Sequence, residues 1–181
     1  MTNWEVVVLQ NWTKATVSVL LMTFVFAGVS RADDFSKGSP ESTAAIKKAI
    51  THWGDVFNRH DAHATAMAYS EDADLTNMLD MTIHGRKEIE QLLQTGFMTR
   101  LKNAHRTVAV KRIHFLAPTI AAVDCDFEIT GETGADGSNA LPLKGELIFD
   151  MSEVEGRWLI NIDHSLLVDR SQRTKLEVPG R

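Results

Sequence analysis

Cysteine is nearly absent from this sequence of 181 residues, and its single thiol, Cys125, restricts the chemistry that the chain can carry. One cysteine excludes an intrachain disulfide and any cysteine-based metal cluster. Because Cys125 lies in a strand-like run, we expect a buried, inert thiol rather than a reactive nucleophile. The sequence also lacks a cluster of Lys and Arg, an internal repeat and a low-complexity tract, and its net charge is −5. Nucleic acid is therefore not an expected partner.

Long hydrophobic runs are also missing, with one exception near the N-terminus. Residues 15–29 are almost wholly apolar and follow Lys14, and small residues in Ser30-Arg31-Ala32 suit a cleavage site. This pattern predicts a secretory signal peptide over residues 1–32. A retained anchor is the alternative, but a membrane span needs about 20 apolar residues. We therefore expect export to the periplasm or the medium and no membrane association after cleavage. The remaining segments are a linker (33–40), one domain (41–169) and a C-terminal tail (170–181).

Three helices are predicted in the first half of the domain. Ser39-Pro40-Glu41 begins the first, because Ser can cap a helix, Pro fits its first turn and Glu favours its positive end. An apolar stripe with helical spacing predicts that one face of this helix is buried. Asp61 can cap a short second helix that extends through Tyr69, and Gly85-Arg86 opens a third. The stripe of the first helix consists of Ile46, Ala49, Ile50, Trp53, Val56 and Phe57.

From Ala104 onward the apolar residues alternate, which is the pattern of strands. A short strand is expected earlier, near residues 75–79. Turn residues separate the later strands, which favours an antiparallel meander. The whole order predicts an α+β fold, in which a curved antiparallel sheet is covered on one side by three N-terminal helices. The four later strands are expected at about 105–115, 119–131, 142–153 and 157–168.

Four short motifs, in a fixed order, carry a resemblance to a known superfamily. They are Trp53…Phe57-Asn58…Asp61, then Tyr69-Ser70-Glu71-Asp72-Ala73-Asp74 with Asn77, then Gly85-Arg86…Ile89, and finally Gly156-Arg157-Trp158…Ile160…His164-Ser165. The chain resembles the nuclear transport factor 2-like, or SnoaL-like, superfamily, and within it is most similar to the SgcJ/EcaC family. The resemblance implies a cone-shaped, cystatin-like barrel with an apolar pocket, and a homodimer formed through the sheet. It implies no single activity, because members include isomerases, cyclases, dehydratases and proteins without known catalysis.

Ketosteroid isomerase belongs to the same superfamily, but its catalytic residues are replaced here. The resemblance places its catalytic tyrosine on Trp53, whose indole has an N–H but no hydroxyl. It places the general-base aspartate on Asn77, which cannot accept a proton at neutral pH, and the buried donor aspartate near Leu147. Steroid isomerisation by that mechanism is therefore not expected.

The predicted last strand contains the best candidate for chemistry, Asp163. Periodicity does not say which face of this strand is inside. The resemblance turns the face of Asp163 toward the pocket, across from Asn77. A desolvated carboxylate has a raised pKa and can act as a general base, whereas a solvated or salt-bridged aspartate is the alternative. Strict alternation places Leu159, Asn161, Asp163 and Ser165 on one face, and Trp158, Ile160, Ile162 and His164 on the other.

The remaining polar clusters have simpler explanations than a metal site. His60-Asp61-Ala62-His63 lies at a helix junction, where the aspartate serves as a cap and the histidines are expected to face solvent. Asp124, Asp126 and Glu128 alternate with apolar residues, and a solvated outer face explains them more simply than a bound divalent cation. No metal or cofactor is expected.

Three hypotheses of function follow. The leading one is an exported domain that binds a small, mostly apolar molecule in a cone-shaped pocket. The second is a cofactor-free enzyme of the isomerase, cyclase or dehydratase type, in which Asp163 is the base and Asn77 donates a hydrogen bond to a developing oxyanion. The third is a non-catalytic dimerisation module with a filled cone. The residues expected to contact a ligand are Trp53, Phe57, Tyr69, Leu147, Phe149, Asn161, His164 and Ser165.

Overall fold

The structure is a computed structural model, and it describes residues 38–134 and 137–168. The expected signal peptide (1–32) and C-terminal tail (170–181) lie outside the described residues and stay predictions. No described helix is long and apolar enough to cross a membrane. The described elements, in chain order, are α2 (Pro40–Asn58), α3 (Ala62–Ala66), β1 (Tyr69–Thr76), β2 (Thr82–His84), α4 (Arg86–Met98), β3 (His105–Ala117), β4 (Ile120–Thr130), β5 (Leu143–Val154) and β6 (Arg157–Leu167).

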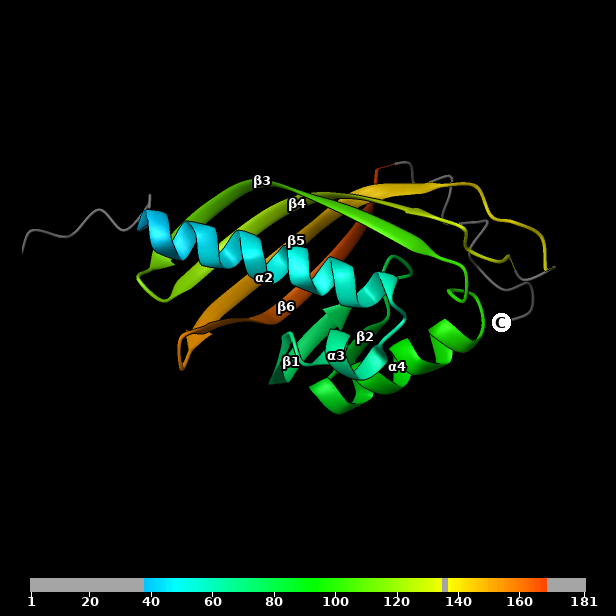
Figure 1. Cartoon of the computed structure of the whole chain (residues 1–181), viewed down its shortest axis with the longest axis horizontal. Helices are drawn as coiled ribbons and strands as arrows, with labels where there is room; N and C mark the ends of the chain where they lie inside the picture. The colour runs from blue at the N-terminus through cyan, green and yellow to red at the C-terminus, as the bar shows by residue number, and fades with distance from the viewer. Residues whose placement is uncertain (1–37, 135–136, 169–181) are drawn as a thin grey trace, which may run out of the picture. The chain divides into compact units, whose positions relative to one another are not determined.

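The strands form one six-stranded sheet in the order β2-β1-β6-β5-β4-β3. Strands β3 to β6 are an antiparallel meander, as the sequence predicts, and β1 adds to β6 in parallel. Figure 1 shows α2 lying along one face of the curved sheet, with α3 and α4 beside β1 and β2. The predicted α+β fold, a curved sheet covered by N-terminal helices, is confirmed, and the parallel β1–β6 pair is the one departure from an antiparallel sheet.

Local sequence determines where each helix begins. The Ser39 hydroxyl accepts a hydrogen bond from the Ser42 N–H at 3.0 Å, and the Asp61 carboxylate accepts one from the Ala64 N–H at 2.9 Å. Both predicted N-caps are therefore confirmed. Helix α4 begins directly after Gly85, whose φ of 86° favours glycine over other residues.

The chain after α3 differs from the prediction. The second helix ends at Ala66 and does not extend through Tyr69, because Tyr69 starts β1 and pairs with Ile160 of β6. Strand β1 therefore runs over Tyr69–Thr76 rather than near residues 75–79. The three-residue β2, which the sequence analysis does not predict, pairs with the end of β1.

A bulge in β6 changes which of its residues face the interior. Met151 of β5 pairs with Ile160, but the preceding β5 residue, Asp150, pairs with Ile162. Asn161 is therefore an extra residue between two paired positions. The strict alternation expected for this strand is wrong. The inner face carries Trp158, Ile160, Asp163 and Ser165, and the outer face carries Ile162 and His164.

The acidic residues of β4 lie on the outer face of the sheet, as expected. Asp124, Asp126 and Glu128 each form a salt bridge with a Lys or Arg of a neighbouring strand. Cys125 lies between them and points the other way, into the core, where it is fully buried. Burial raises the pKa of its thiol to about 12, which agrees with the expected inert thiol.

Aromatic side chains of α2 fill the space between the helix and the concave face. Trp53 packs edge-on against Phe149 of β5, with ring centres 5.3 Å apart, and Phe57 packs edge-on against Phe97 of α4 at 5.1 Å. All four side chains are buried. Aromatic rings contribute most to the stability of such a core, so the helix and the sheet hold each other in place.

The homodimer expected through the sheet stays a prediction, and the outer face offers one apolar patch for it. Ile148, Ile162 and Leu166 lie on neighbouring positions of β5 and β6 and are 40%, 48% and 37% exposed. If this patch forms the dimer, Ile162→Asp should convert the protein to a monomer, because it places a charge in an apolar interface. Size-exclusion chromatography with light scattering measures the mass.

Met98→Asp is the matched control for the dimer, since Met98 is 67% exposed at the end of α4 and is not part of this patch. It should leave the mass unchanged. A monomeric wild type, or equal behaviour of the two variants, would contradict a dimer formed through this patch.

Candidate functional site

One buried hydrogen bond joins the first and last strands inside the curved sheet. The hydroxyl of Tyr69, at the start of β1, donates to Oδ2 of Asp163 on β6 at 2.7 Å. The two side chains are only 1% and 2% exposed. Asp163 pairs with Leu75 of β1 on one side and with Phe149 of β5 on the other. Its carboxyl group therefore lies on the inner wall of the sheet, away from both sheet edges.

Burial changes the acidity of this pair. It raises the pKa of Asp163 from 3.8 to about 6, although the Tyr69 hydroxyl and the charge of Arg106 act in the opposite direction. Burial and the neighbouring carboxylate raise the pKa of Tyr69 well above its ordinary value, so the hydroxyl keeps its proton and remains a donor. A carboxyl group with a pKa near neutrality can both take up and return a proton. Asp163 therefore has the acidity of a general acid–base group.

Two buried polar atoms next to this hydrogen bond have no hydrogen-bond partner among the described residues: Oδ1 of Asp163 and Nε1 of Trp53. Trp53 is 1% exposed, and its indole N–H interacts weakly with the Tyr69 hydroxyl from beyond hydrogen-bond distance, which opposes in small part the rise in the pKa of Tyr69 caused by burial. Ser165 is likewise close enough to the Asp163 carboxyl to lower its pKa. Buried polar atoms nearly always have a partner in folded proteins. An unpartnered acceptor and an unpartnered donor therefore define a polar site within the apolar interior.

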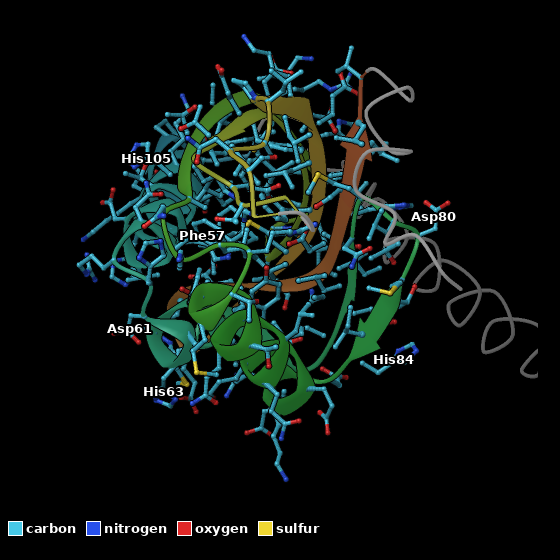
Figure 2. All side chains as sticks on the ribbon, turned by 90° about the vertical axis from the view of Figure 1, so that its right-hand side faces the viewer. Phe57, Asp61, His63, Asp80, His84 and His105 are labelled. Atoms are coloured by element: carbon cyan, nitrogen blue, oxygen red, sulfur yellow. The ribbon has the colours of Figure 1, made fainter. Side chains whose placement is uncertain are left out.

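Arg106 brings a positive charge to the same interior. Its guanidinium carbon lies 3.9 Å from the ring centre of Phe57 and 4.8 Å from that of Trp53. Asn58, the last residue of α2, holds the Arg106 backbone: the Asn58 side-chain nitrogen donates to the Arg106 carbonyl at 2.8 Å, and the Asn58 side-chain oxygen accepts from the Arg106 N–H at 2.7 Å. Figure 2 shows Phe57 within the curl of the sheet, whereas the other labelled residues lie around its outside.

A second buried carboxyl group interacts with Arg106. Glu132, in the loop after β4, is 1% exposed, and neither of its carboxyl oxygens has a hydrogen-bond partner among the described residues. Its Oε1 lies 3.7 Å from Nη2 of Arg100, and burial raises its pKa. Arg106 interacts electrostatically with both Glu132 and Asp163. Two arginines thus balance two buried carboxyl groups.

Neither Arg106 nor Glu132 is among the site residues predicted from the sequence. Arg106 alternates with Val108 and Val110 along β3, so it occupies the apolar face of that strand, and a charged residue at such a position is a usable signal. Glu132 lies in a Gly-rich connection without periodicity, and nothing in the sequence indicates the direction of its side chain.

The structure brings most of the predicted site residues together. They line one continuous region of the concave face and the α2 side that covers it. The residues in this region are Trp53, Phe57, Tyr69, Leu147, Phe149, Asp163 and Ser165.

Three predicted site residues have other positions. Asn161 is the bulge residue, and its side-chain oxygen accepts a hydrogen bond from the Ser152 hydroxyl of β5 at 3.1 Å. His164 lies on the outer face, because it follows Asp163, which points inward, and successive residues of a strand point to opposite faces. Asn77 lies just after β1, where its side-chain oxygen accepts hydrogen bonds from two backbone N–H groups of the β1–β2 turn. The structure therefore gives Asn77 a role in the turn, not opposite Asp163.

The interior combines a buried carboxyl group, a hydroxyl donor and an indole N–H in an apolar environment. Among residues 38–134 and 137–168, no group of three or more His, Cys, Asp or Glu side chains is placed to hold a metal ion. Asp163 can exchange a proton through Oδ1, while its other oxygen is held by Tyr69. Trp53 can donate a hydrogen bond to an oxygen atom next to it.

A sequence model of the SnoaL-like domain family matches residues 39–162. Among curated proteins, none matches the sequence significantly. Solved structures that are similar include an uncharacterized protein with a cystatin-like fold from Caulobacter vibrioides, with a TM-score of 0.65 and 20% identity over 74% of this chain and 94% of that chain.

Two further similar structures carry names of enzymes. A ketosteroid isomerase-like protein from Erwinia carotovora atroseptica has a TM-score of 0.63 and 20% identity, over 72% of this chain and 99% of that chain. A proposed scytalone dehydratase from Novosphingobium aromaticivorans has a TM-score of 0.62 and 15% identity, over 71% of this chain and 85% of that chain. Likeness at these identities shows the fold alone.

Asp163→Asn should remove a pH dependence of stability. The folded protein binds more protons at Asp163 than the unfolded chain does, because the pKa of this group is raised from 3.8 to about 6. The stability that this group provides is present at low pH and is lost as the pH rises through about 6. The free energy of unfolding of the variant minus that of wild type should therefore increase by on the order of 3 kcal/mol from about pH 4 to pH 7.

Urea unfolding across that pH range measures the difference, and the contribution of Glu132 cancels because both proteins contain it. Asp126→Asn is the matched control, since Asp126 is exposed on the outer face, and it should show no such gain. Parallel pH profiles of wild type and Asp163→Asn would contradict the raised pKa.

Proposed function

Since the chain belongs to the SnoaL-like domain family, we propose that its curved sheet binds a small, mostly apolar molecule that carries one oxygen function. The apolar part packs against the aromatic and aliphatic side chains of the interior, and the oxygen meets the polar site at Trp53, Tyr69 and Asp163. Asp163 then transfers a proton, which makes the domain a cofactor-free acid–base catalyst of the isomerase, cyclase or dehydratase type. Membership of the SgcJ/EcaC family, to which the sequence motifs are most similar, stays a prediction.

One observation carries this proposal: an unpartnered donor and an unpartnered acceptor lie in the same buried site. A buried polar atom without a partner costs about 1–3 kcal/mol. A ligand oxygen can accept the Trp53 indole N–H, and a hydroxyl or an acidic C–H of the same ligand can approach Oδ1 of Asp163. Binding would then satisfy both atoms at once.

The hydrogen bond from Tyr69 gives the two carboxyl oxygens of Asp163 different roles. Oδ2 is held by the Tyr69 hydroxyl, so Oδ1 is the oxygen that exchanges a proton with the ligand. Negative charge that develops on the ligand oxygen is stabilised by the indole N–H and by the positive charge of Arg106. Trp53 thereby takes the donor role that the sequence analysis assigns to Asn77.

The names of two similar structures agree with this chemistry, but they are not evidence for it. One is named for an isomerase and another for a dehydratase. Their identity to this chain is 20% or less, so the proposal depends on the side chains of this site.

A filled interior favours the third hypothesis, a non-catalytic interaction module. Trp53 packs against Phe149, and Phe115 packs against Trp158 with ring centres 6.0 Å apart. These contacts occupy much of the concave face, so a ligand must fit between them and the polar site. The ligand-binding domain and the non-catalytic module differ in whether small molecules reach the Trp53 indole.

Phenylacetone and propylbenzene test the binding, because they are similar in shape and differ in a carbonyl oxygen. We expect phenylacetone to bind about tenfold more tightly, since it alone supplies an acceptor for the Trp53 N–H. Binding is followed by NMR through the indole N–H resonance of Trp53, assigned with Trp53→Phe. No shift of this resonance with either compound would reject the binding and favour the filled module.

The acid–base step has a separate readout, the exchange of the benzylic hydrogens of phenylacetone for deuterium from the solvent. Wild type should accelerate this exchange, with a rate that rises as the pH passes through about 6 and Asp163 ionises. Asp163→Asn should abolish the acceleration, and Asp126→Asn on the outer face should leave it unchanged. Exchange that persists in Asp163→Asn would remove Asp163 from this role.

A further inference from the structure

We propose that Arg106 binds an oxoanion and that the ligand of this domain is a small, apolar carboxylic acid, held at Arg106 by its carboxylate. The inference rests on the proposed function, because it names the chemical class of the ligand for the same interior. It adds a second polar contact, separate from Asp163, that decides which molecules are recognised.

The donors of the Arg106 guanidinium are free to meet a ligand. The guanidinium makes no hydrogen bond and no salt bridge with any residue in the described part of the chain, and its Nε is buried without a partner. An arginine side chain presents five N–H donors in one plane and carries its charge at all physiological pH values. A partly buried guanidinium without a hydrogen bond is unusual, and here its charge is offset only through space, by Asp163 and Glu132.

The surroundings hold this guanidinium in one orientation. Its central carbon lies over the rings of Phe57 and Trp53, at 3.9 Å and 4.8 Å from the ring centres, and cation–π contacts of this kind stabilise the charge. The backbone of Arg106 is fixed at both its N–H and its carbonyl by the side chain of Asn58. A donor group that is already ordered loses little entropy when it binds an anion.

The neighbouring charges favour a monoanion. Glu132 is paired with Arg100 at 3.7 Å, and Asp163 accepts a hydrogen bond from Tyr69 at 2.7 Å, so neither buried carboxyl group depends on Arg106 alone. Each of them, when ionised, repels a second negative charge at short range, which disfavours a phosphate dianion. A carboxylate carries one charge, and its two oxygens match the planar fork of the guanidinium. The adjoining rings of Phe57 and Trp53 suit an apolar body attached to that carboxylate.

Phenylacetate and phenylacetamide test the proposal, because they share size and shape and only the acid is charged. We expect wild type to bind phenylacetate about 10- to 100-fold more tightly, as for hydrogen bonds to a charged group. Isothermal titration calorimetry at neutral pH and low salt measures both affinities. Equal affinities for the two compounds, or no binding of phenylacetate, would overturn the proposal.

Arg106→Gln should bind phenylacetate and phenylacetamide with about equal affinity, because the preference for the acid depends on the charge of Arg106. Arg112→Gln is the matched control: it removes the same charge from the same strand, but Arg112 pairs with Asp124 on the outer face. It should keep the full preference for the acid. A preference that survives in Arg106→Gln, or that disappears in Arg112→Gln, contradicts an anion site at Arg106.

A measurement on the wild-type protein tests the same proposal without relying on the folding of Arg106→Gln. Phenylglyoxal modifies free guanidinium groups, and peptide mass mapping identifies the modified arginines. Phenylacetate should protect Arg106 and leave the modification of Arg112 unchanged, whereas phenylacetamide should protect neither. Equal protection of Arg106 by the acid and the amide would overturn the proposal.

The outcomes separate this inference from the proposed function. Binding of phenylacetone at Trp53 without a preference for phenylacetate would overturn the anion site and keep the proposed function. A preference for phenylacetate that depends on Arg106 and persists in Asp163→Asn, in a protein that catalyses no deuterium exchange, would support the anion site and contradict the acid–base step.

Discussion

The chemistry of this interior depends on one constraint, the exclusion of water from the concave face of the sheet by α2. Trp53 packs against Phe149 of β5 and Phe57 packs against Phe97 of α4, and burial raises the pKa of Asp163 to about 6. An aspartate on an exposed strand would ionise near its ordinary value and could not return a proton at neutral pH. The same exclusion of water strengthens the field of Arg106 within the site. Burial therefore determines both the acidity of Asp163 and the strength of the Arg106 charge within the site.

The polar groups of the interior also connect secondary-structure elements to one another. Tyr69 and Asp163 connect β1 to β6, and Asn58 connects the end of α2 to the Arg106 backbone at the start of β3. Such contacts stabilise the arrangement of the elements, while the unpartnered atoms of Trp53 and Asp163 cost stability. Proteins commonly accept this cost at a functional site, where satisfying every group would remove the means of binding a ligand. The exposed salt bridges on the outer face contribute much less to stability.

Sequence predicts those parts of the structure that depend on local rules. The caps at Ser39 and Asp61 and the four long strands follow from residue type and period alone. The inner face of β6 does not, because the bulge at Asn161 inserts one residue, and every position on one side of it then changes face. The position of Tyr69 at the start of β1 depends on pairing with β6, which is distant in sequence. The direction of Glu132 depends on an irregular loop, and no period describes it.

The charge of Arg106 and the carboxyl group of Asp163 are linked by electrostatics, so the proposed anion site and the proposed acid–base group would affect each other. The charge of Arg106 lowers the pKa of Asp163 from the value that burial alone would give. An anion bound to Arg106 offsets that charge, so the pKa of Asp163 rises when a carboxylate binds. By thermodynamic linkage, protonation of Asp163 must strengthen the binding of the anion to the same extent. A carboxylic acid that binds with its anion at Arg106 therefore meets Asp163 in its protonated form more often than a neutral ligand does. Binding of an anion at Arg106 and protonation of Asp163 would therefore favour each other.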